Sequence, residues 1–234
     1  MDEIIVAGHN RAKVEQISRQ LRGAATVRSA PPDIYPEFDE DSVAEGTAFE
    51  GIATNDPVAS GDAIERIARA KAAAWSRVLP RRADGDLPLV VATDGGLLIP
   101  GLGSAWDPTR TRRFAGEGAS AHERVAKLLG LAAHLHGDER RIGWREALAV
   151  SRDGEVLESW IADSPGGWLA FAPADRVDDD DPFWVPLVWS CPEFGGRRLA
   201  ELSADERQAR VDHWSVLGQQ LRRWVARSSS PAGC

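Results

Sequence analysis

The chain has 234 residues, of which 43% are hydrophobic and 27% are charged, and its formal net charge is −8. These fractions are typical of a soluble globular protein, and the length suits one large domain or two small lobes. Nucleic acids and anionic membranes are polyanions, so the negative charge argues against either as the main partner. The apolar run in the N-terminal segment MDEIIVAGHN is too short for a signal peptide or a membrane span. We therefore expect a cytoplasmic protein.

Strand-like and helix-like patterns alternate along the chain, with helical apolar spacing in some segments and short apolar runs in others. The elements expected, in chain order, are a strand at 3–7, a helix carrying Val14, Ile17 and Leu21, a loop at 29–60, a helix from Asp62 with a capping box to Glu65, a strand at 89–92, a helix from Ser120 with a capping box to Glu123, strands at 145–151 and 155–162 around an Asp153-Gly154 turn, a short helix from Ser203 with Glu206, and a final helix carrying Val216 to Val225. This order predicts an α/β fold around a mixed sheet.

A single acid ends the most apolar run of the chain, in the stretch VVATDGGLLIPGLG at 90–103. Asp94 is followed at once by two glycines. In open α/β sheets ligands gather beyond the carboxyl ends of strands, which would place this acid at a site of chemistry. The other interpretation is an Asp-Gly turn that only ends the strand. The residues alone leave both interpretations open.

Two lysines and an asparagine are candidates for holding phosphate. The segment GHNRAK at 8–13 forms a strand-to-helix turn, in which free amides, Asn10 and Lys13 would bind phosphate oxygens. An ordinary helix start fits the same residues. Lys71 falls on the core-facing stripe of its helix, seven residues after Ile64. An amine at such a position must either reach solvent along its stem or meet an anion.

The loop at 29–60 is rich in acids, among them Glu37, Glu45 and Glu50. A carboxylate from this loop together with Asp94 would form a hard oxygen site suited to Mg²⁺, which uses few protein ligands and keeps its waters for substrate phosphates. The four aspartates at 178–181 are more typical of a solvated loop.

Arginines follow the acid closely, at positions 110, 112 and 113. In a chain of net negative charge, this cluster favours an anionic ligand. His213 stands at an expected helix start, and no serine or cysteine nucleophile is marked out as its partner. A hydrolase triad is therefore not indicated.

Taken in order, these motifs resemble the inosine triphosphate pyrophosphatase family, whose members cleave aberrant purine nucleoside triphosphates to monophosphate and pyrophosphate with magnesium. GHNRAK is similar to the family's TGNxxK, IARAKA to NALxKA, TDGGLLIPGLGS to DDSGLxVxxLGG, and TRRFAG to SARYAG. Later, RLAELSADER and DHWSVLG resemble TFAELSxEEK and SHRxxAL. The resemblance spans nearly the whole chain. The residues that match are Asn10, Lys13, Lys71, Asp94, Gly96, Arg113 and His213.

The resemblance implies an elongated mixed β-sheet flanked by helices, with a central cleft between two lobes, in a homodimer. We expect one domain over 1–227 and a disordered tail at 228–234. Asp94, Lys13 and Lys71 would carry the chemistry on a nucleoside triphosphate, and the other matching residues would bind it. Mg²⁺ would be held by Asp94 and by Glu37 or Glu45, because about twenty additional residues before the Lys71 helix leave the loop glutamate ambiguous.

Three positions depart from the family pattern. Thr93 replaces the first acid of DDSG, Val185 replaces an acid that helps read the purine base, and Trp214 replaces a base-reading arginine. Trp184 and Trp214 would instead stack on the base. The phosphate side is mostly retained while the base side is rewritten, which leaves three hypotheses: a pyrophosphatase of the family type, one with changed base specificity, or a nucleotide-binding module without catalysis. The related Maf pyrophosphatases also place a single acid after a buried strand, in an ADT motif. The C-terminal half of this chain, however, resembles them less than it resembles the inosine triphosphate pyrophosphatases.

Overall fold

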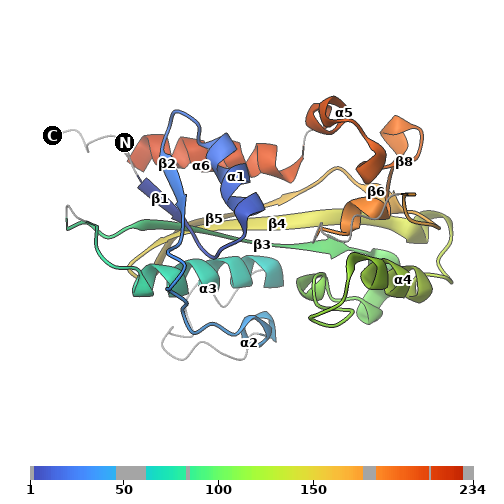
Figure 1. The fold of residues 1–234 in the computed structure, drawn as a ribbon, viewed down its shortest axis with the longest axis horizontal. Coiled ribbons are helices and arrows are strands. Elements are labelled where there is room, and N and C mark those ends of the chain that lie inside the picture. Colours follow the sequence, from blue (N-terminus) through green and yellow to red (C-terminus); the bar gives the residue numbers. More distant parts are fainter. Residues whose placement is uncertain (1–2, 46–61, 83–84, 176–182, 211, 229–234) are drawn as a thin grey trace. The chain divides into compact units, whose positions relative to one another are not determined.

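The computed structural model describes residues 3–45, 62–82, 85–175, 183–210 and 212–228 (Figure 1). Within them, strands and helices alternate in an α/β fold, as the sequence predicts. The elements are β1 (Glu3–Val6), α1 (Arg11–Gln20), β2 (Thr26–Ser29), α2 (Glu40–Glu45), α3 (Ala63–Val78), β3 (Leu89–Leu98), α4 (Ala121–Leu131), β4 (Arg141–Arg152), β5 (Glu155–Asp163), β6 (Gly167–Leu169), β7 (Trp189–Cys191), β8 (Arg197–Arg198), α5 (Ala204–Ala209) and α6 (His213–Ser228).

The strands form a mixed sheet in the order β2-β1-β3-β4-β6-β7-β8, with β5 paired to β4. β1 runs parallel to β2 and to β3, whereas β6 is antiparallel to β4 and to β7. Between β4 and β5, Asp153 and Gly154 have φ angles of 51° and 81°. Two-residue hairpin turns that match the twist of the strands require this left-handed conformation. The predicted mixed sheet and hairpin are both confirmed.

The chain divides into two compact units, and β3 and β4 contribute residues to each. The first unit consists of Met1–Gly95, Glu146–Ala162 and His213–Cys234, and the second of Gly96–Arg145 and Asp163–Asp212. Of the residues singled out in the sequence, the first unit contains Asn10, Lys13, Lys71, Asp94, His213 and Trp214. The second unit contains Gly96, Arg113 and Trp184.

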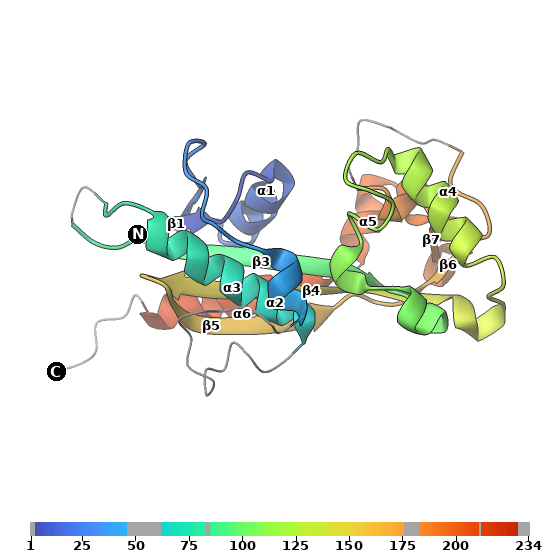
Figure 2. The same ribbon diagram turned by 90° about the horizontal axis from the view of Figure 1, so that it is seen from below.

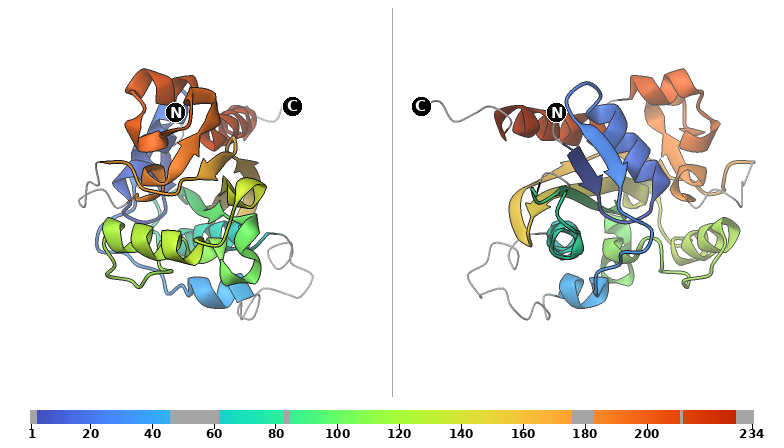
Figure 3. Two further views of the ribbon diagram at one scale, coloured as in Figure 1. Left: turned by 90° about the vertical axis from the view of Figure 1, so that its right-hand side faces the viewer. Right: turned by 60° about the vertical axis from the view of Figure 1, so that its left-hand side comes forward.

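Helices cover both faces of the sheet in the first unit (Figures 1 and 3). Val91 of β3 packs in a cluster with residues of α1 and α6, and Ala92 packs in a cluster with residues of α3. Successive side chains of a strand point to opposite faces. Thr93 therefore belongs to the α1 side of the sheet and Asp94 to the α3 side.

The second unit has a core of its own, in which α4 packs with residues of β6 and β7 (Figure 2). Arg140 is buried beside this core, and its guanidinium group donates to four carbonyl oxygens, those of Ala132, Leu135, Leu169 and Ala170. A buried arginine needs such acceptors because desolvation of its charge is costly. The same desolvation lowers the pKa of Arg140. One side chain thus joins the end of α4 to the segment that contains β6.

β3 differs from its predicted form, because it continues from Leu89 through Leu98 instead of ending at Asp94. The interpretation of Asp94 and Gly95 as a strand-ending turn is therefore wrong. Close packing against another backbone explains why position 96 is a glycine. A Cβ atom at this position would lie 2.1 Å from the carbonyl oxygen of Pro108. Glycine thus allows the strand to pass close to a neighbouring backbone.

Helix starts agree with the sequence in most places. Ser120 and Ser203 form the predicted capping boxes with Glu123 and Glu206. Asp62, however, caps α3 through the amide of Ile64. Glu65 instead accepts a hydrogen bond from Ser159 Oγ of β5, at 2.7 Å.

Several predicted segments lie partly or wholly outside the described residues. Of the predicted loop at 29–60, residues 40–45 form α2, and 46–61 are not described. The aspartates at 178–181 and the tail from 229 onward also lie outside the description. Among the described helices, none has the length and apolar character that crossing a membrane requires.

Candidate functional site

The turn between β1 and α1 positions the first candidate residues. Gly8 has a φ of 85°, a conformation that favours glycine, and Asn10 is the N-cap of α1. The Asn10 Oδ1 atom accepts a hydrogen bond from the Lys13 amide at 3.3 Å. An ordinary helix start is therefore present, as the sequence allowed. Because the cap uses the side-chain oxygen, the Asn10 amide nitrogen keeps its two donors for another acceptor, such as a phosphate.

Lys13 links α1 to two neighbouring strands. Its Nζ atom donates to the carbonyl oxygen of Thr93 at 3.1 Å and lies 3.4 Å from Glu146 Oε1. Thr93 is on β3 and Glu146 is on β4. The ammonium group is therefore held at the end of α1, next to the strand position that precedes Asp94.

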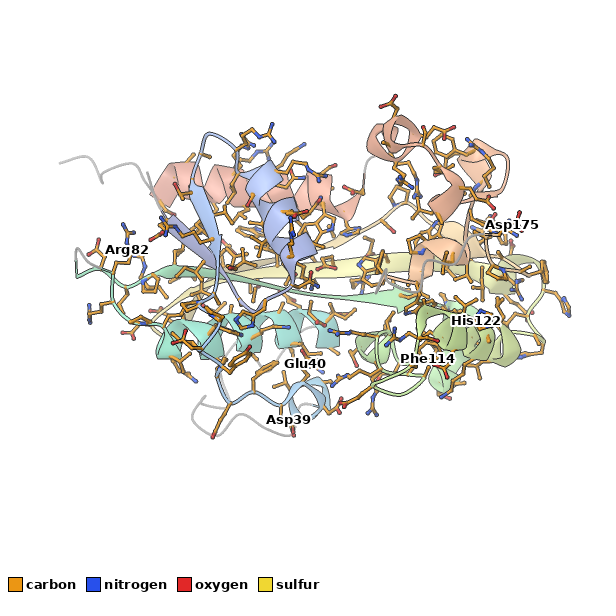
Figure 4. The ribbon with its side chains drawn as sticks, in the orientation of Figure 1. Asp39, Glu40, Arg82, Phe114, His122 and Asp175 are labelled. Atoms are coloured by element: carbon orange, nitrogen blue, oxygen red, sulfur yellow. The ribbon has the colours of Figure 1, made fainter. Side chains whose placement is uncertain are left out.

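Lys71 meets an anion from the acidic loop. Its Nζ atom lies 3.3 Å from Glu40 Oε1, and both side chains are partly exposed. Glu40 begins α2, which packs along α3 (Figures 2 and 4). Of the two outcomes expected for an amine on this stripe, the structure has the ion pair.

Among the titratable groups of the described residues, Asp94 is the one whose pKa is raised to about 7. Burial raises the pKa of its carboxyl group to about 7, against the opposing effect of Lys13 and Lys71, and the charges of Glu40 and Glu146 raise it further. Asp94 as a whole residue is partly exposed, whereas its carboxyl group is densely surrounded and desolvated. A pKa that is shifted both by burial and by specific charged neighbours is typical of residues in functional sites. Asp94 thus lies among two cations and two acids, all within the first unit.

In the described part of the chain, the acids whose charges act on Asp94 are Glu40 and Glu146, which were not among those expected from the sequence. Glu37 is exposed, and the side chain of Glu45, the last residue of α2, lies outside the described part. Glu40 and Glu146 were both missed. Nothing local marks Glu40, because its contact with Lys71 depends on how α2 packs on α3. Glu146 had a signal, since it is an acid within the apolar strand segment REALAV.

The donor set suits a hard divalent cation with few protein ligands. In the described part of the chain, no group of three or more histidine, cysteine or acidic side chains could hold a metal ion on its own. Asp94 and Glu40 supply two carboxylates; Glu40 is paired with Lys71, and the charges of Lys13 and Lys71 act on Asp94. Mg²⁺ typically binds one or two carboxylates and completes its shell with waters and substrate phosphates, so these residues fit it.

In the second unit, the candidate residues lie in turns and in the core. Gly96 has the packing role described above, and Arg113 lies in the turn that follows a short 3-10 helix at 108–110. Trp184 precedes a second short helix instead of lying in a strand, and its ring centroid is 5.5 Å from that of Phe114. Val185 is 1% exposed within the core. Phosphate binding by Arg113 and base stacking by Trp184 stay predictions.

His213 and Trp214 begin α6 in the first unit, with ring centroids 5.5 Å apart. Trp214 is partly buried against the cluster that α1 and α6 form on the sheet. This packing buries part of the Trp214 side chain. The substrate-binding roles expected for both residues stay predictions.

The chain is similar to known proteins over nearly its whole length. The model of the Ham1 family matches residues 4–224. A dITP/XTP pyrophosphatase of Rhodospirillum centenum is 31% identical, with 96% of both chains covered. A dITP/XTP pyrophosphatase of Thermoanaerobacter sp. is 29% identical over 95% of this chain and 96% of that protein. The structure of the Staphylococcus aureus Ham1 protein, at 18% identity, superposes with a TM-score of 0.66 over 97% of this chain and all of that one, which confirms the fold. By the extent of the family match and of these relatives, the chain belongs to the Ham1 family.

Proposed function

We propose that this protein is a magnesium-dependent pyrophosphatase that cleaves a nucleoside triphosphate between the α and β phosphorus atoms, releasing monophosphate and pyrophosphate. The class of enzyme, a nucleoside triphosphate pyrophosphatase, follows from the family and from the named relatives. The observation that carries the proposal for these residues is Asp94, whose carboxyl lies among Lys13, Lys71 and Glu40 with a pKa raised to about 7.

Asp94 would orient either the metal or the attacking water, and in the second of these roles, with no metal on its carboxylate, it is suited to accept a proton from the water. A general base is most effective when its pKa lies near the working pH, and burial has moved this carboxyl into that range. Lys13 and Lys71 come from helices on opposite faces of the sheet. Each would hold phosphate oxygens as a point charge, so that the triphosphate stays in line with the water.

Magnesium would be held by Asp94 and by a glutamate of the acidic loop, and when bound it would screen the negative charge of the phosphates. Among the described loop residues, Glu40 is the one whose charge acts on Asp94. Glu37→Gln, Glu40→Gln and Glu45→Gln, measured one at a time, identify the ligand. The variant that raises the Mg²⁺ concentration needed for half-maximal rate marks the ligand, and unchanged Mg²⁺ dependence in Glu40→Gln would remove Glu40 from this role.

The base side of the site favours a second candidate function, a pyrophosphatase with changed base specificity. Val185 is 1% exposed within the core, and an aliphatic side chain cannot hydrogen-bond a base edge. The relatives are named for dITP and XTP. These two nucleotides are the substrates we propose first, and a substrate read by other groups is the alternative.

One experiment decides between these readings. Pure protein with Mg²⁺ is incubated with dITP, XTP, ITP and the common nucleoside triphosphates, and the products are separated. We expect monophosphate and pyrophosphate in equal amounts, with one base preferred, and loss of turnover in Asp94→Asn. Orthophosphate as the only product, or no turnover of any nucleotide, would contradict the proposal. Binding of a nucleotide without turnover would instead point to a module that has lost catalysis.

We also propose that the protein is cytoplasmic and, as the resemblance implies, that it is a homodimer. Sedimentation equilibrium of the purified chain tests the assembly, since a mass near twice 25.4 kDa is expected.

A further inference from the structure

Glu146 is a buried acid that the roles assigned so far do not use. It lies on β4, within a run of buried residues, and is 2% exposed. Burying a carboxylate costs free energy unless a cation or hydrogen-bond donors compensate for its lost hydration. An apolar residue would pack at this position without that cost, as Leu148 and Val150 do on the same face of the strand. The acid therefore calls for a functional explanation.

Lys13 is the cation that Glu146 meets. Its Nζ atom lies 3.4 Å from Glu146 Oε1 and 3.1 Å from the carbonyl oxygen of Thr93. Two oxygens from two adjacent strands thus hold one ammonium group. A lysine side chain has four rotatable bonds, so such a pair of contacts selects one position among many.

Thr93 lies on the same face of the sheet as Glu146. The alternation of β3 places it on the α1 side with Val91, and the alternation of β4 places Glu146 there with Leu148. The Thr93 side chain is buried, at 3% exposed, and its hydroxyl oxygen has no hydrogen-bond partner among the described residues. A buried hydroxyl without a partner is uncommon and marks a position where packing alone does not explain the residue.

We propose that Glu146 is a positioning residue for the proposed reaction: it holds the Lys13 ammonium group against the adjacent strands β3 and β4, next to the Thr93-Asp94 segment, and it supplies there the negative charge that Thr93 does not. The acid that the family pattern places at position 93 is thus moved to the adjacent strand. Glu146 acts through Lys13 and touches neither substrate nor metal. The proposal rests on the proposed function, because positioning matters only if Lys13 binds phosphate.

The first test asks whether Glu146 acts through Lys13. Glu146→Gln keeps the size of the side chain and removes its charge. We expect kcat/KM for the preferred nucleotide to fall by about 10- to 100-fold, the range typical for the loss of a residue that supports a ligand-binding side chain. In a Lys13→Met background the same change should have less than about a twofold further effect, because the group it positions is gone. Losses that multiply would overturn the proposal.

The second test moves the charge back. Thr93→Asp alone should lower kcat/KM, because the new aspartate and Glu146 then compete for the Lys13 ammonium group. In Glu146→Gln, however, Thr93→Asp should restore most of the lost rate, since a carboxylate returns to the same face. A role of Glu146 in packing alone predicts no rescue. Glu65→Gln, the same chemical change on α3, is the matched control and should keep wild-type kcat/KM.

A readout independent of turnover separates this proposal from the proposed function. Acetylation of Lys13 by acetic anhydride is followed by peptide mass spectrometry in the absence of nucleotide. We expect Glu146→Gln to speed labelling of Lys13 several-fold and Thr93→Asp to reverse it in the double variant. If Glu146→Gln does not fold, Glu146→Asp, which shortens the side chain, should still be acetylated at Lys13 faster than the wild type. Unchanged labelling would overturn the proposal, whereas wild-type protein without pyrophosphatase activity would overturn only the function.

Discussion

Replacing Asp94 by asparagine should make the protein more stable at alkaline pH while it removes activity. The folded state raises the pKa of this carboxyl from 3.8 to about 7, mainly by burial. Between these values the folded state binds the proton more tightly than the unfolded state. Stability therefore falls as pH rises from about 4 to about 7 and stays reduced above that range. Asparagine does not titrate, so the variant escapes this loss.

The size of the effect follows from the pKa difference. Each pKa unit corresponds to about 1.4 kcal/mol, so the full shift corresponds to an upper bound of about 4 kcal/mol above pH 7. The partial exposure of Asp94 and rearrangement of Lys13 and Lys71 reduce this figure. We expect Asp94→Asn to raise the free energy of unfolding by about 1–3 kcal/mol at pH 8, and the gain to vanish near pH 4.

Urea unfolding in the presence of a chelator, at pH values from 4 to 8, measures this gain. Asp33→Asn serves as the control, because Asp33 is exposed and its loss should change little at any pH. If Asp94→Asn is no more stable than the wild type at pH 8, or if its advantage grows toward acid pH, the assignment of Asp94 as a carboxyl raised by burial is refuted. Adding Mg²⁺ should stabilise the wild type and leave Asp94→Asn unaffected, since the metal binds the ionised carboxylate.

Three further changes test the site and its support. Lys71→Met removes a cation from the proposed phosphate site and leaves Glu40 without its ion-pair partner; kcat/KM should fall at least about tenfold with little loss of secondary structure by circular dichroism. Arg140→Met takes four hydrogen bonds from buried carbonyl groups and should lower the free energy of unfolding by about 3–5 kcal/mol in urea titrations, with Arg140→Lys intermediate. Gly96→Ala brings a Cβ atom against the Pro108 carbonyl oxygen and should lower the free energy of unfolding by about 1–3 kcal/mol, seen as a lower midpoint of thermal unfolding. An unchanged midpoint would contradict the close approach of the two backbones.

Patterns within single elements could be read from the sequence. Ser120 with Glu123 predicts a helix start, and Asp153-Gly154 predicts a hairpin, because capping and tight turns depend on residues close in the chain. The helical stripe of α3 also predicts that the Lys71 amine either reaches solvent or meets an anion. The order of the motifs indicates the family, because several specific residues recur together over nearly the whole chain.

Partners between elements could not be read in this way. Lys13 meets a carbonyl group 80 residues away, and Lys71 meets a glutamate 31 residues before it. Such contacts depend on the packing of helices on a sheet, and no local rule selects one of several acids in a loop. The continuation of β3 past Asp94 is another case. Gly96 belongs to this strand because the backbone of another segment, at Pro108, passes too close for a side chain.

The sequence by itself determined the α/β class and the family, and it singled out Asp94, Lys13 and Lys71 as candidates, since helix and strand periods and motif order are properties of the chain alone. Only the tertiary structure decided that Glu40 and Glu146 share the surroundings of Asp94. The faces of β3 and β4 and the packing of α1, α2 and α3 bring these acids to the lysines. Their charges then act on one buried carboxyl, whose pKa depends on three-dimensional distance and desolvation rather than on spacing along the chain.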